Sequence, residues 1–276
     1  MTIDHRPLAY EVGPLMITGF GLAVLAAFVV AQIVAQHELK RRGYNPEPVG
    51  DMIFAAVLGS LVGAKLYFVA LTGDIDTLFS RGGFVFWGGL IGGILAVTIL
   101  VMRRKLGFWR IADVAGLSIM PAYAVGRTGC WAVGDDYGRP WDSPLAVRFP
   151  EGAPPSTAQN MQEMFGIPVP ADVPPNTVLA VHPTQLYEVT MAFILFLLLL
   201  RLRDHKHAEG WLMGVYCVMA GVERFIVEFF RAKDDRFFGV LTVAQVIALV
   251  FIAIGIAVMA MRSRVTPEAR GIYATA

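Results

Sequence analysis

Several apolar stretches of this chain are long enough to cross a lipid bilayer, and this feature constrains its fold more than any other. A transmembrane helix needs about 20 mainly apolar residues to cross roughly 30 Å of hydrocarbon. Hydrophobic residues make up 56% of the 276 residues and charged residues only 16%, whereas a soluble protein has about 25% charged residues. The expected spans are residues 14–35, 51–72, 83–102, 111–133, 186–200, 210–230 and 241–261.

The fourth and sixth expected spans are the least apolar. We count them because a span that carries polar groups usually faces a protein interior or a cavity. The first apolar run is expected to be a span rather than a signal peptide, since it is long, acidic Asp4 and Glu11 precede it, and basic residues follow it. The predicted fold class is therefore an all-α polytopic membrane protein with seven transmembrane helices.

The Lys and Arg residues between the spans predict the orientation, because cytoplasmic loops carry an excess of them. Of the 23 Lys and Arg residues, 13 lie after spans one, three and five or in the C-terminal tail. Seven lie in the other connections and 3 lie inside spans. The expected topology has the N-terminus outside and the C-terminus in the cytoplasm, and the predicted location is the bacterial cytoplasmic (inner) membrane.

One connection is much longer than the others. Residues 134–181 are rich in Pro, Asp and small polar residues, as in 153–156 and 173–176, and loops of this length are usually functional or disordered. We expect a small ordered extracytoplasmic head there, with irregular arms. The predicted organisation places transmembrane helices one to four in residues 1–133, and helices five to seven with a cytoplasmic tail in 182–276.

Ionisable residues inside the spans gather near the outer membrane face. Charged groups inside a bilayer are costly and by default mark function. Spans two, four and six run outward and span five begins outside, so four helices bring polar groups to one depth. These residues are Lys65, Arg127, His182, Gln185, Tyr187, Glu188, Glu223, Arg224, Glu228 and Arg231. The alternative is a set of snorkelling charges at helix ends, which fits Lys65 and Arg231 better than the deeper Arg127 and Arg224.

The arginines of this group suit a phosphate ligand. Arg224 and Glu228 are four residues apart and share a helix face, so Glu228 is expected to hold one guanidinium while another binds ligand. A guanidinium stays charged, and its planar fork matches phosphate oxygens in a bidentate way. A phosphate held at headgroup depth indicates a membrane phospholipid. The net charge of +1 gives no reason to expect a nucleic-acid partner.

Five sequence motifs surround these residues. They are GRTGCW in 126–131, GDDYGRP in 134–140, HPTQLYE in 182–188, GGFVFWGGLIGG in 82–93 and ERFIVEFFR in 223–231. Together, in their order along the chain, they resemble the bacterial prolipoprotein diacylglyceryl transferases. The resemblance covers all seven expected spans, with the head poorly matched.

The resemblance implies transfer of a diacylglyceryl group from phosphatidylglycerol to the lipobox cysteine thiol of a preprolipoprotein, with loss of glycerol phosphate. Arg127 and Arg224 would stabilise the charge that develops on the leaving phosphate. His182 is the best candidate base by residue type, and no cofactor or metal is required. The expected catalytic residues are His182, Arg127, Arg224 and Glu228, and the expected substrate-binding residues are Gln185, Tyr187, Gly138, Arg139, Asp135, Arg231, Trp87 and Phe20.

Three positions depart from the usual pattern of that family. Phe20 stands where a tyrosine is usual, Trp87 where a histidine or a tyrosine is usual, and Cys130 where an asparagine is usual. Trp87 can donate a hydrogen bond but cannot accept a proton. The phosphate-binding part is thus retained, while the thiol-activating part is altered.

Other interpretations stay open on the sequence alone. A divergent paralogue would bind phosphatidylglycerol and use another acceptor. A non-catalytic lipid-binding or transport protein is a third interpretation, although no internal repeat of the kind found in many transporters is visible. The glycines within 88–93 are also explained by close helix packing. His182 is also explained as a helix-start residue bonded to a neighbour, and Cys130 and Cys217 as inert buried thiols.

Overall fold

The computed structural model describes residues 3–12, 15–79, 83, 85–233, 236–237 and 241–264. The helices are α1 Gly19–Arg41, α2 Pro48–Thr72, the short 3-10 helix η1 Ile75–Phe79, α3 Phe86–Arg103, α4 Phe108–Val133, α5 Ala158–Glu163, α6 Thr184–Leu202, α7 Trp211–Val227 and α8 Val243–Met261. The strands are β1 Ile3–Asp4, β2 Ala9–Val12, β3 Leu15–Thr18, β4 Val147–Arg148, β5 Ala180–Val181, β6 Arg236–Phe237 and β7 Leu241–Thr242. Arg81 and Arg270, both used in the charge count, and Gly82 and Phe84 of the glycine motif lie outside the described residues.

Five of the described helices are long and apolar enough to cross a membrane, namely α1, α2, α3, α6 and α8. Helices α4 and α7 coincide with the predicted fourth and sixth spans. However, α7 has 17 residues, and α4 contains the charged residues Arg110, Asp113 and Arg127. A helical, multi-pass membrane protein is therefore confirmed, and the count of seven spans stays a prediction.

The first helix begins and ends later than the predicted span 14–35, so that prediction was wrong at both ends. Residues Leu15–Thr18 form β3, which pairs antiparallel with β2, and α1 therefore begins only at Gly19. At the other end, the buried Glu38 accepts hydrogen bonds from Arg41 and Arg42 at 2.9 and 2.6 Å. These contacts within one helical turn extend the helix past its apolar part.

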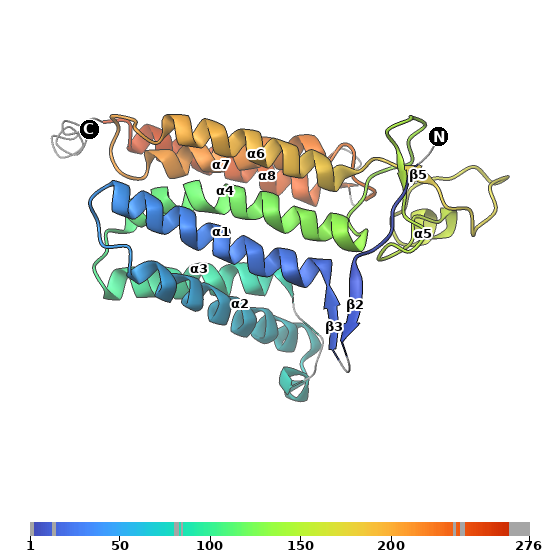
Figure 1. Ribbon diagram of the computed structural model, residues 1–276, viewed down its shortest axis with the longest axis horizontal. Coiled ribbons are helices and arrows are strands. Elements are labelled where there is room, and N and C mark those ends of the chain that lie inside the picture. The colour runs from blue at the N-terminus through green and yellow to red at the C-terminus, as the bar shows by residue number, and fades with distance from the viewer. Residues whose placement is uncertain are drawn as a thin grey trace. The chain divides into compact units, whose positions relative to one another are not determined.

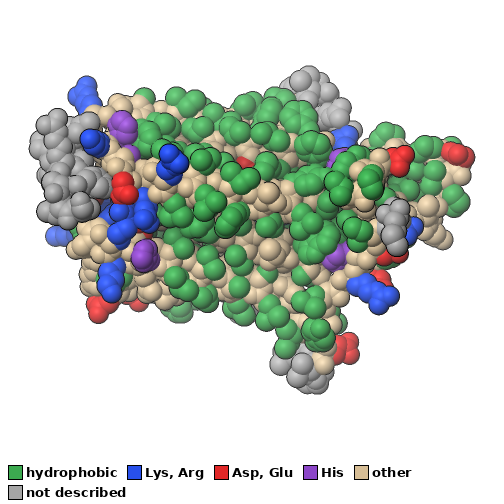
Figure 2. Space-filling view, turned by 45° about the horizontal axis from the view of Figure 1, so that its top comes forward, with side chains coloured by type: hydrophobic (Ala, Val, Ile, Leu, Met, Phe, Trp, Pro, Cys, Tyr) green, Lys and Arg blue, Asp and Glu red, His purple; other side chains and the backbone are tan. Residues whose placement is uncertain are grey.

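The chain divides into two compact units. One comprises Met1–Ala31 with Gly116–Ala276, and the other comprises Gln32–Ala115. Large hydrophobic side chains project from the helices of both units, and hydrophobic side chains cover much of the helical surface seen in Figure 2. Exposed apolar surface of this extent marks contact with lipid in a membrane protein.

In the Gln32–Ala115 unit, α2 and α3 approach each other along glycines. A Cβ at Gly63 would collide with the backbone oxygen of Gly88, and one at Gly59 with the backbone oxygen of Gly92. The packing explanation of Gly88 and Gly92 is thus confirmed, since small residues let membrane helices pack closely.

In the larger unit, α6, α7 and α8 run alongside one another (Figure 1). Gly214 of α7 and Gly255 of α8 face each other so closely that a Cβ on either would press against the other's backbone oxygen. Helix α8 begins with a capping box, in which Thr242 and Gln245 each bond the other's backbone nitrogen. The glycine contact packs α8 against α7, which carries Arg224.

Residues 134–181 pack around an apolar core that they share with neighbouring parts of the larger unit. Strand β4 pairs parallel with β1 and antiparallel with β5, and α5 lies between β4 and β5 in the chain. The core residues are Tyr137, Val147, Phe149, Met161, Ile167, Val181 and Ala232. The segment is therefore ordered, while its extracytoplasmic position stays a prediction.

Candidate functional site

Glu188 lies at the centre of an ion-pair network in the larger unit. It is 1% exposed and comes from the beginning of α6. Its carboxylate forms an ion pair with Arg127 of α4, and Oε1 lies 3.6 Å from Nη1 of Arg224 and 3.9 Å from Nη1 of Arg231. Tyr123 of α4 donates a hydrogen bond of 3.2 Å to Oε1. Three arginines from separate segments therefore converge on one buried carboxylate.

Asp136, in the turn after α4, holds two of these arginines. Its Oδ2 lies 2.8 Å from Nη1 of Arg127, and its Oδ1 lies 2.6 Å from Nη2 of Arg231. The backbone of Asp136 has a φ of 56°, in the left-handed region where Asp is more frequent than most residues. Burial opposes ionisation, but the charges of Arg231 and Arg127 outweigh it and lower the pKa of Asp136 to about 2. Asp136 is therefore ionised throughout the physiological pH range.

Glu228, at the end of α7, holds Arg224 as the four-residue spacing predicted. Its Oε2 lies 2.7 Å from Nη2 of Arg224 and 3.8 Å from Nε of Arg231. Nη1 of Arg224 is buried and faces Oε1 of Glu188 as an ion pair rather than a hydrogen bond. The Arg224 side chain is 31% exposed, compared with 10% for Arg127 and 15% for Arg231. Arg224 is thus the member best placed to bind an anion. We call the arginine network the set of Arg127, Arg224, Arg231, Glu188, Asp136 and Glu228.

The first turn of α6 fixes the turn that carries Asp136. The buried Gln185 donates from Nε2 to the backbone oxygen of Asp135, and Thr184 donates from Oγ1 to the backbone oxygen of Asp136 at 2.7 Å. Gln185 therefore stabilises the turn that positions Asp136. Its predicted contact with substrate stays a prediction.

Gly138 and Arg139 tie the same turn to the segment after α7. The backbone nitrogen of Arg139 donates to the oxygen of Phe230 at 2.8 Å, and a Cβ at Gly138 would collide with that same oxygen. The Arg139 guanidinium donates to the backbone oxygens of Arg231 and Lys233 at 3.1 and 3.2 Å. Arg139 thus holds the backbone that carries Arg231, and its predicted binding of substrate stays a prediction.

His182 precedes α6, and its ring lies among aromatic side chains. It stacks on Trp141 with ring centroids 4.2 Å apart and meets Phe230 at 5.3 Å. Its Nδ1 lies 3.1 Å from the hydroxyl of Tyr187, so the expected bond between a helix-start histidine and a neighbour is confirmed. Burial lowers the pKa of His182. The imidazole is therefore neutral near pH 7, the form that a base requires, while its role as base stays a prediction.

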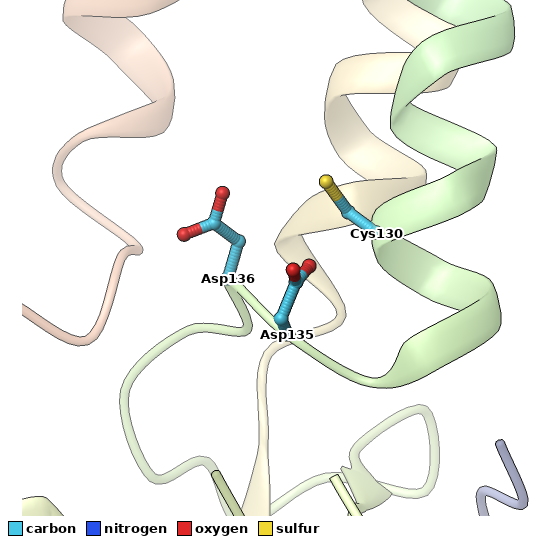
Figure 3. A group of neighbouring side chains, drawn as sticks. All are labelled: Cys130, Asp135 and Asp136. Carbon is cyan, nitrogen blue, oxygen red and sulfur yellow. The ribbon is translucent and has the colours of Figure 1, made fainter. Parts of the chain in front are cut away.

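Cys130, Asp135 and Asp136 bring a thiol and two carboxylates together (Figure 3). Their potential ligand atoms lie within 4.8 Å of one another, a grouping that raises the question of a metal ion. Nη1 of Arg127 already lies 3.1 Å from Sγ of Cys130 and 2.8 Å from Oδ2 of Asp136. A metal ion would be placed against this guanidinium charge, so the group fits a cation poorly. Burial and the neighbouring charge of Asp136 raise the pKa of Asp135.

Phe20 of α1 and Trp87 of α3 are both exposed side chains. Phe20 is 43% exposed, and its backbone lies close to Gly129 of α4. Trp87 is 41% exposed, and its ring meets Phe86 edge to face at 5.5 Å. Trp87 belongs to the Gln32–Ala115 unit, whereas the arginine network belongs to the other unit. Binding of substrate by these two residues stays a prediction.

The sequence prediction gave no role to three residues of the site. Glu188 closes the HPTQLYE motif, and Asp136 adjoins the chosen Asp135, so the motifs pointed to both positions without ranking them. Tyr123 lies four residues before Arg127 on the same helix face. That spacing was the one available signal for Tyr123.

Comparison with known proteins points to the same family as the sequence motifs. The family model described as prolipoprotein diacylglyceryl transferase matches residues 7–261. A phosphatidylglycerol–prolipoprotein diacylglyceryl transferase of Solidesulfovibrio magneticus is 31% identical over 274 residues, which cover 93% of this chain and 94% of that protein. Proteins with the same name from Clostridium tetani and Trichormus variabilis are 28% identical over 259 residues and 29% identical over 279 residues. These alignments cover 91% and 95% of this chain, and 95% and 92% of the two relatives.

Proposed function

The chain belongs to the prolipoprotein diacylglyceryl transferase family, and from this membership we propose its reaction. The protein transfers the diacylglyceryl group of phosphatidylglycerol to the lipobox cysteine thiol of a preprolipoprotein and releases glycerol phosphate. The observation that carries the proposal is the arginine network, because three guanidinium groups held in place by carboxylates match the phosphate of a lipid headgroup.

In the reaction, the sulfur of the acceptor cysteine attacks the diacylglyceryl carbon that bears the phosphate oxygen. A carbon–sulfur bond forms and the carbon–oxygen bond breaks, so the product is a thioether. The bonding electrons leave with the oxygen, and the released phosphate gains negative charge. Guanidinium groups that are already in place stabilise this charge more than the ground state, which is how binding energy accelerates a reaction.

The carboxylates of the network keep the arginines in position before the lipid arrives. Arg127 is held by Glu188 and Asp136, and Arg224 is held by Glu228. We assign phosphate contact first to Arg224, whose side chain is the most exposed of the three arginines. Preorganisation of this kind avoids reorganisation during the reaction.

The thiol proton needs an acceptor, and we assign it to His182. Its imidazole is neutral near pH 7 because burial lowers the pKa of this residue, and a neutral ring nitrogen accepts a proton. Tyr187 orients the ring through Nδ1. The positive field of the arginines favours the thiolate, since nearby positive charge lowers a thiol pKa.

We place the protein in the bacterial inner membrane with seven spans. These are the five apolar helices together with α4 and α7. Both helices carry the polar residues of the arginine network and its neighbours, and such residues face a protein interior. The Lys and Arg bias puts the N-terminus and residues 134–181 outside and the C-terminus in the cytoplasm.

The test is transfer by the purified protein in vesicles that contain phosphatidylglycerol, with a lipobox peptide as acceptor. We expect a thioether-linked diacylglyceryl peptide by mass spectrometry and an equal amount of glycerol phosphate. The same protein should also sustain a strain depleted of its own transferase. Release of glycerol phosphate with an unmodified peptide thiol would instead support another acceptor and contradict the proposal.

A further inference from the structure

A groove lies between α6 and α7 in the larger unit. Its walls are almost entirely apolar, with Met191, Ile194 and Leu195 from α6 and Val218, Met219 and Val222 from α7. Ile194 and Val222 are 50% and 42% exposed, so the groove opens to the surface that faces lipid. An apolar groove of this kind accepts a hydrocarbon chain.

One end of the groove adjoins the arginine network. On α6, Met191 follows Glu188 by three residues, which is nearly one helical turn. On α7, Glu223 lines the groove and directly precedes Arg224. Val218 precedes Glu223 by five residues on α7. At 1.5 Å per residue, it therefore lies about 7.5 Å further from the network along the helix.

Glu223 is the charged residue of the lining, and the reaction described above does not use it. It is 5% exposed, and its Oε1 is buried without a hydrogen-bond partner among the described residues. Buried polar groups are normally paired, because an unpaired one loses its water without compensation. The groove thus combines apolar walls with one unsatisfied polar group beside the phosphate site.

The arginine network, Glu223 and the apolar walls follow one another in the same order as the groups of a glycerophospholipid. Such a lipid has a phosphate, then an acyl ester with carbonyl oxygens, then a hydrocarbon chain. We propose that the α6–α7 groove binds one acyl chain of the phosphatidylglycerol donor, with the ester beside Glu223 and the phosphate on Arg224. The inference rests on the proposed function and adds the place where the donor's chain lies.

The effect of the groove is on orientation rather than on partitioning. A lipid chain in the bilayer is already in an apolar medium. Binding in the groove is therefore stabilised by packing contacts and not by the hydrophobic effect. Holding the chain directs the reacting carbon below the arginines, and correct placement of a reacting atom accelerates a reaction. Glu223 is accordingly a positioning residue, with its effect exerted through the ester.

The first test is photolabelling in phosphatidylcholine vesicles that contain phosphatidylglycerol with a diazirine in one acyl chain. We expect label on peptides that include Met191–Leu195 and Val218–Val222, reduced by added unlabelled phosphatidylglycerol and not by phosphatidylcholine. Equal labelling of α2 and α3, or equal competition by both lipids, indicates a general lipid annulus and overturns the proposal. This readout needs no turnover, so it is independent of the proposed reaction.

The second test fills the groove with Val218→Phe. The matched control is Val246→Phe, on the exposed surface of α8. We compare kcat/KM for dipalmitoyl and dihexanoyl phosphatidylglycerol, because the short chains end before the level of Val218. The long-to-short ratio should fall by about fivefold or more in Val218→Phe, from overpacking, and should stay at the wild-type value in the control. Transfer by Val218→Phe with the wild-type ratio overturns the groove, whereas absence of transfer by the wild type overturns the proposed function.

The third test separates the hydrogen bond of Glu223 from its charge. Because the ester oxygens only accept, the proposed contact requires Glu223 as the neutral acid, whose O–H donates to the ester carbonyl. Glu223→Gln keeps a donor through its side-chain NH2, and Glu223→Leu removes it. We expect Leu to lower kcat/KM for phosphatidylglycerol by about tenfold and Gln to keep about a third of the wild-type value or more, as loss of one buried hydrogen bond predicts. If Gln is as defective as Leu, the charge of Glu223 matters and the ester contact is wrong.

Discussion

Arg231 and Asp136 are 95 positions apart in the sequence, yet Nη2 of Arg231 lies 2.6 Å from Oδ1 of Asp136. The other oxygen of the same carboxylate binds Arg127 at 2.8 Å. One short side chain in a left-handed turn thus connects the end of α4 with the segment after α7. The geometry of the proposed phosphate site depends on this carboxylate.

Asp136→Asn should lower the transfer rate by about tenfold or more, because Asn tolerates the left-handed backbone but removes the charge that holds two arginines. Since the pKa of Asp136 is about 2, the loss should be the same at every pH between about 5 and 9. The control is Asp4→Asn, which breaks an exposed pair with Arg148 and should change the rate little. A pH-dependent loss in Asp136→Asn would argue against a permanently ionised carboxylate.

Arg127→Lys and Arg224→Lys should each lower turnover by more than about tenfold, since Lys keeps the charge but lacks the planar fork. Turnover is measured in phosphatidylglycerol vesicles, and thermal unfolding confirms that each variant is folded. Arg203→Lys, at the far end of α6 from Glu188, is the matched control. Near-normal turnover in both network variants would rule out a bidentate phosphate contact.

His182 should give the pH–rate profile an ascending limb with its midpoint below about 6.5, because activity needs the neutral imidazole and burial lowers the pKa of this residue. The protonated ring dominates below that midpoint, so the rate falls as the pH falls. His182→Gln should remove the limb, and Tyr187→Phe should move it by removing the partner of Nδ1. His207→Gln, whose ring bonds the backbone of Ser263, serves as control. An unchanged profile in His182→Gln would make His182 a structural residue.

Gly138→Ala should lower the free energy of unfolding by about 1–3 kcal/mol, the usual cost of overpacking, because its Cβ would meet the carbonyl oxygen of Phe230. Gly126→Ala is the matched control, since no atom lies within 4 Å of its Cβ position. That helical site should gain about 0.5–1 kcal/mol on the same change. Thermal unfolding in detergent gives the sign of both effects, and equal midpoints for the two variants would contradict the packing argument.

Cysteine labelling tests the proposed orientation of the chain. Ser156 is fully buried and unsuitable as a labelling position, whereas Asn176 and Lys206 are exposed. Asn176→Cys should react with an impermeant maleimide in spheroplasts, and Lys206→Cys should react only after permeabilisation. The native thiols Cys130 and Cys217 are buried and give little background. The reverse pattern would invert the topology.

The sequence by itself determined the features that depend on local order along the chain. Apolar runs located five helices that are long and apolar enough to cross a membrane, because hydropathy needs no knowledge of neighbours in space. The spacing of Arg224 and Glu228 predicted their contact, because four residues make about one helical turn. The motifs indicated the family for the same reason, since each is a continuous run of residues.

Only the tertiary structure decided which groups pair across helices. Glu188 became the centre of the network because α4, α6 and α7 bring Arg127 and Arg224 to it. Asp136 rather than Asp135 holds the arginines because a left-handed turn directs the two side chains differently. The strength of an ion pair falls with distance. The distance between segments that are far apart in the sequence is set by how the helices pack, and no local pattern of residues predicts it.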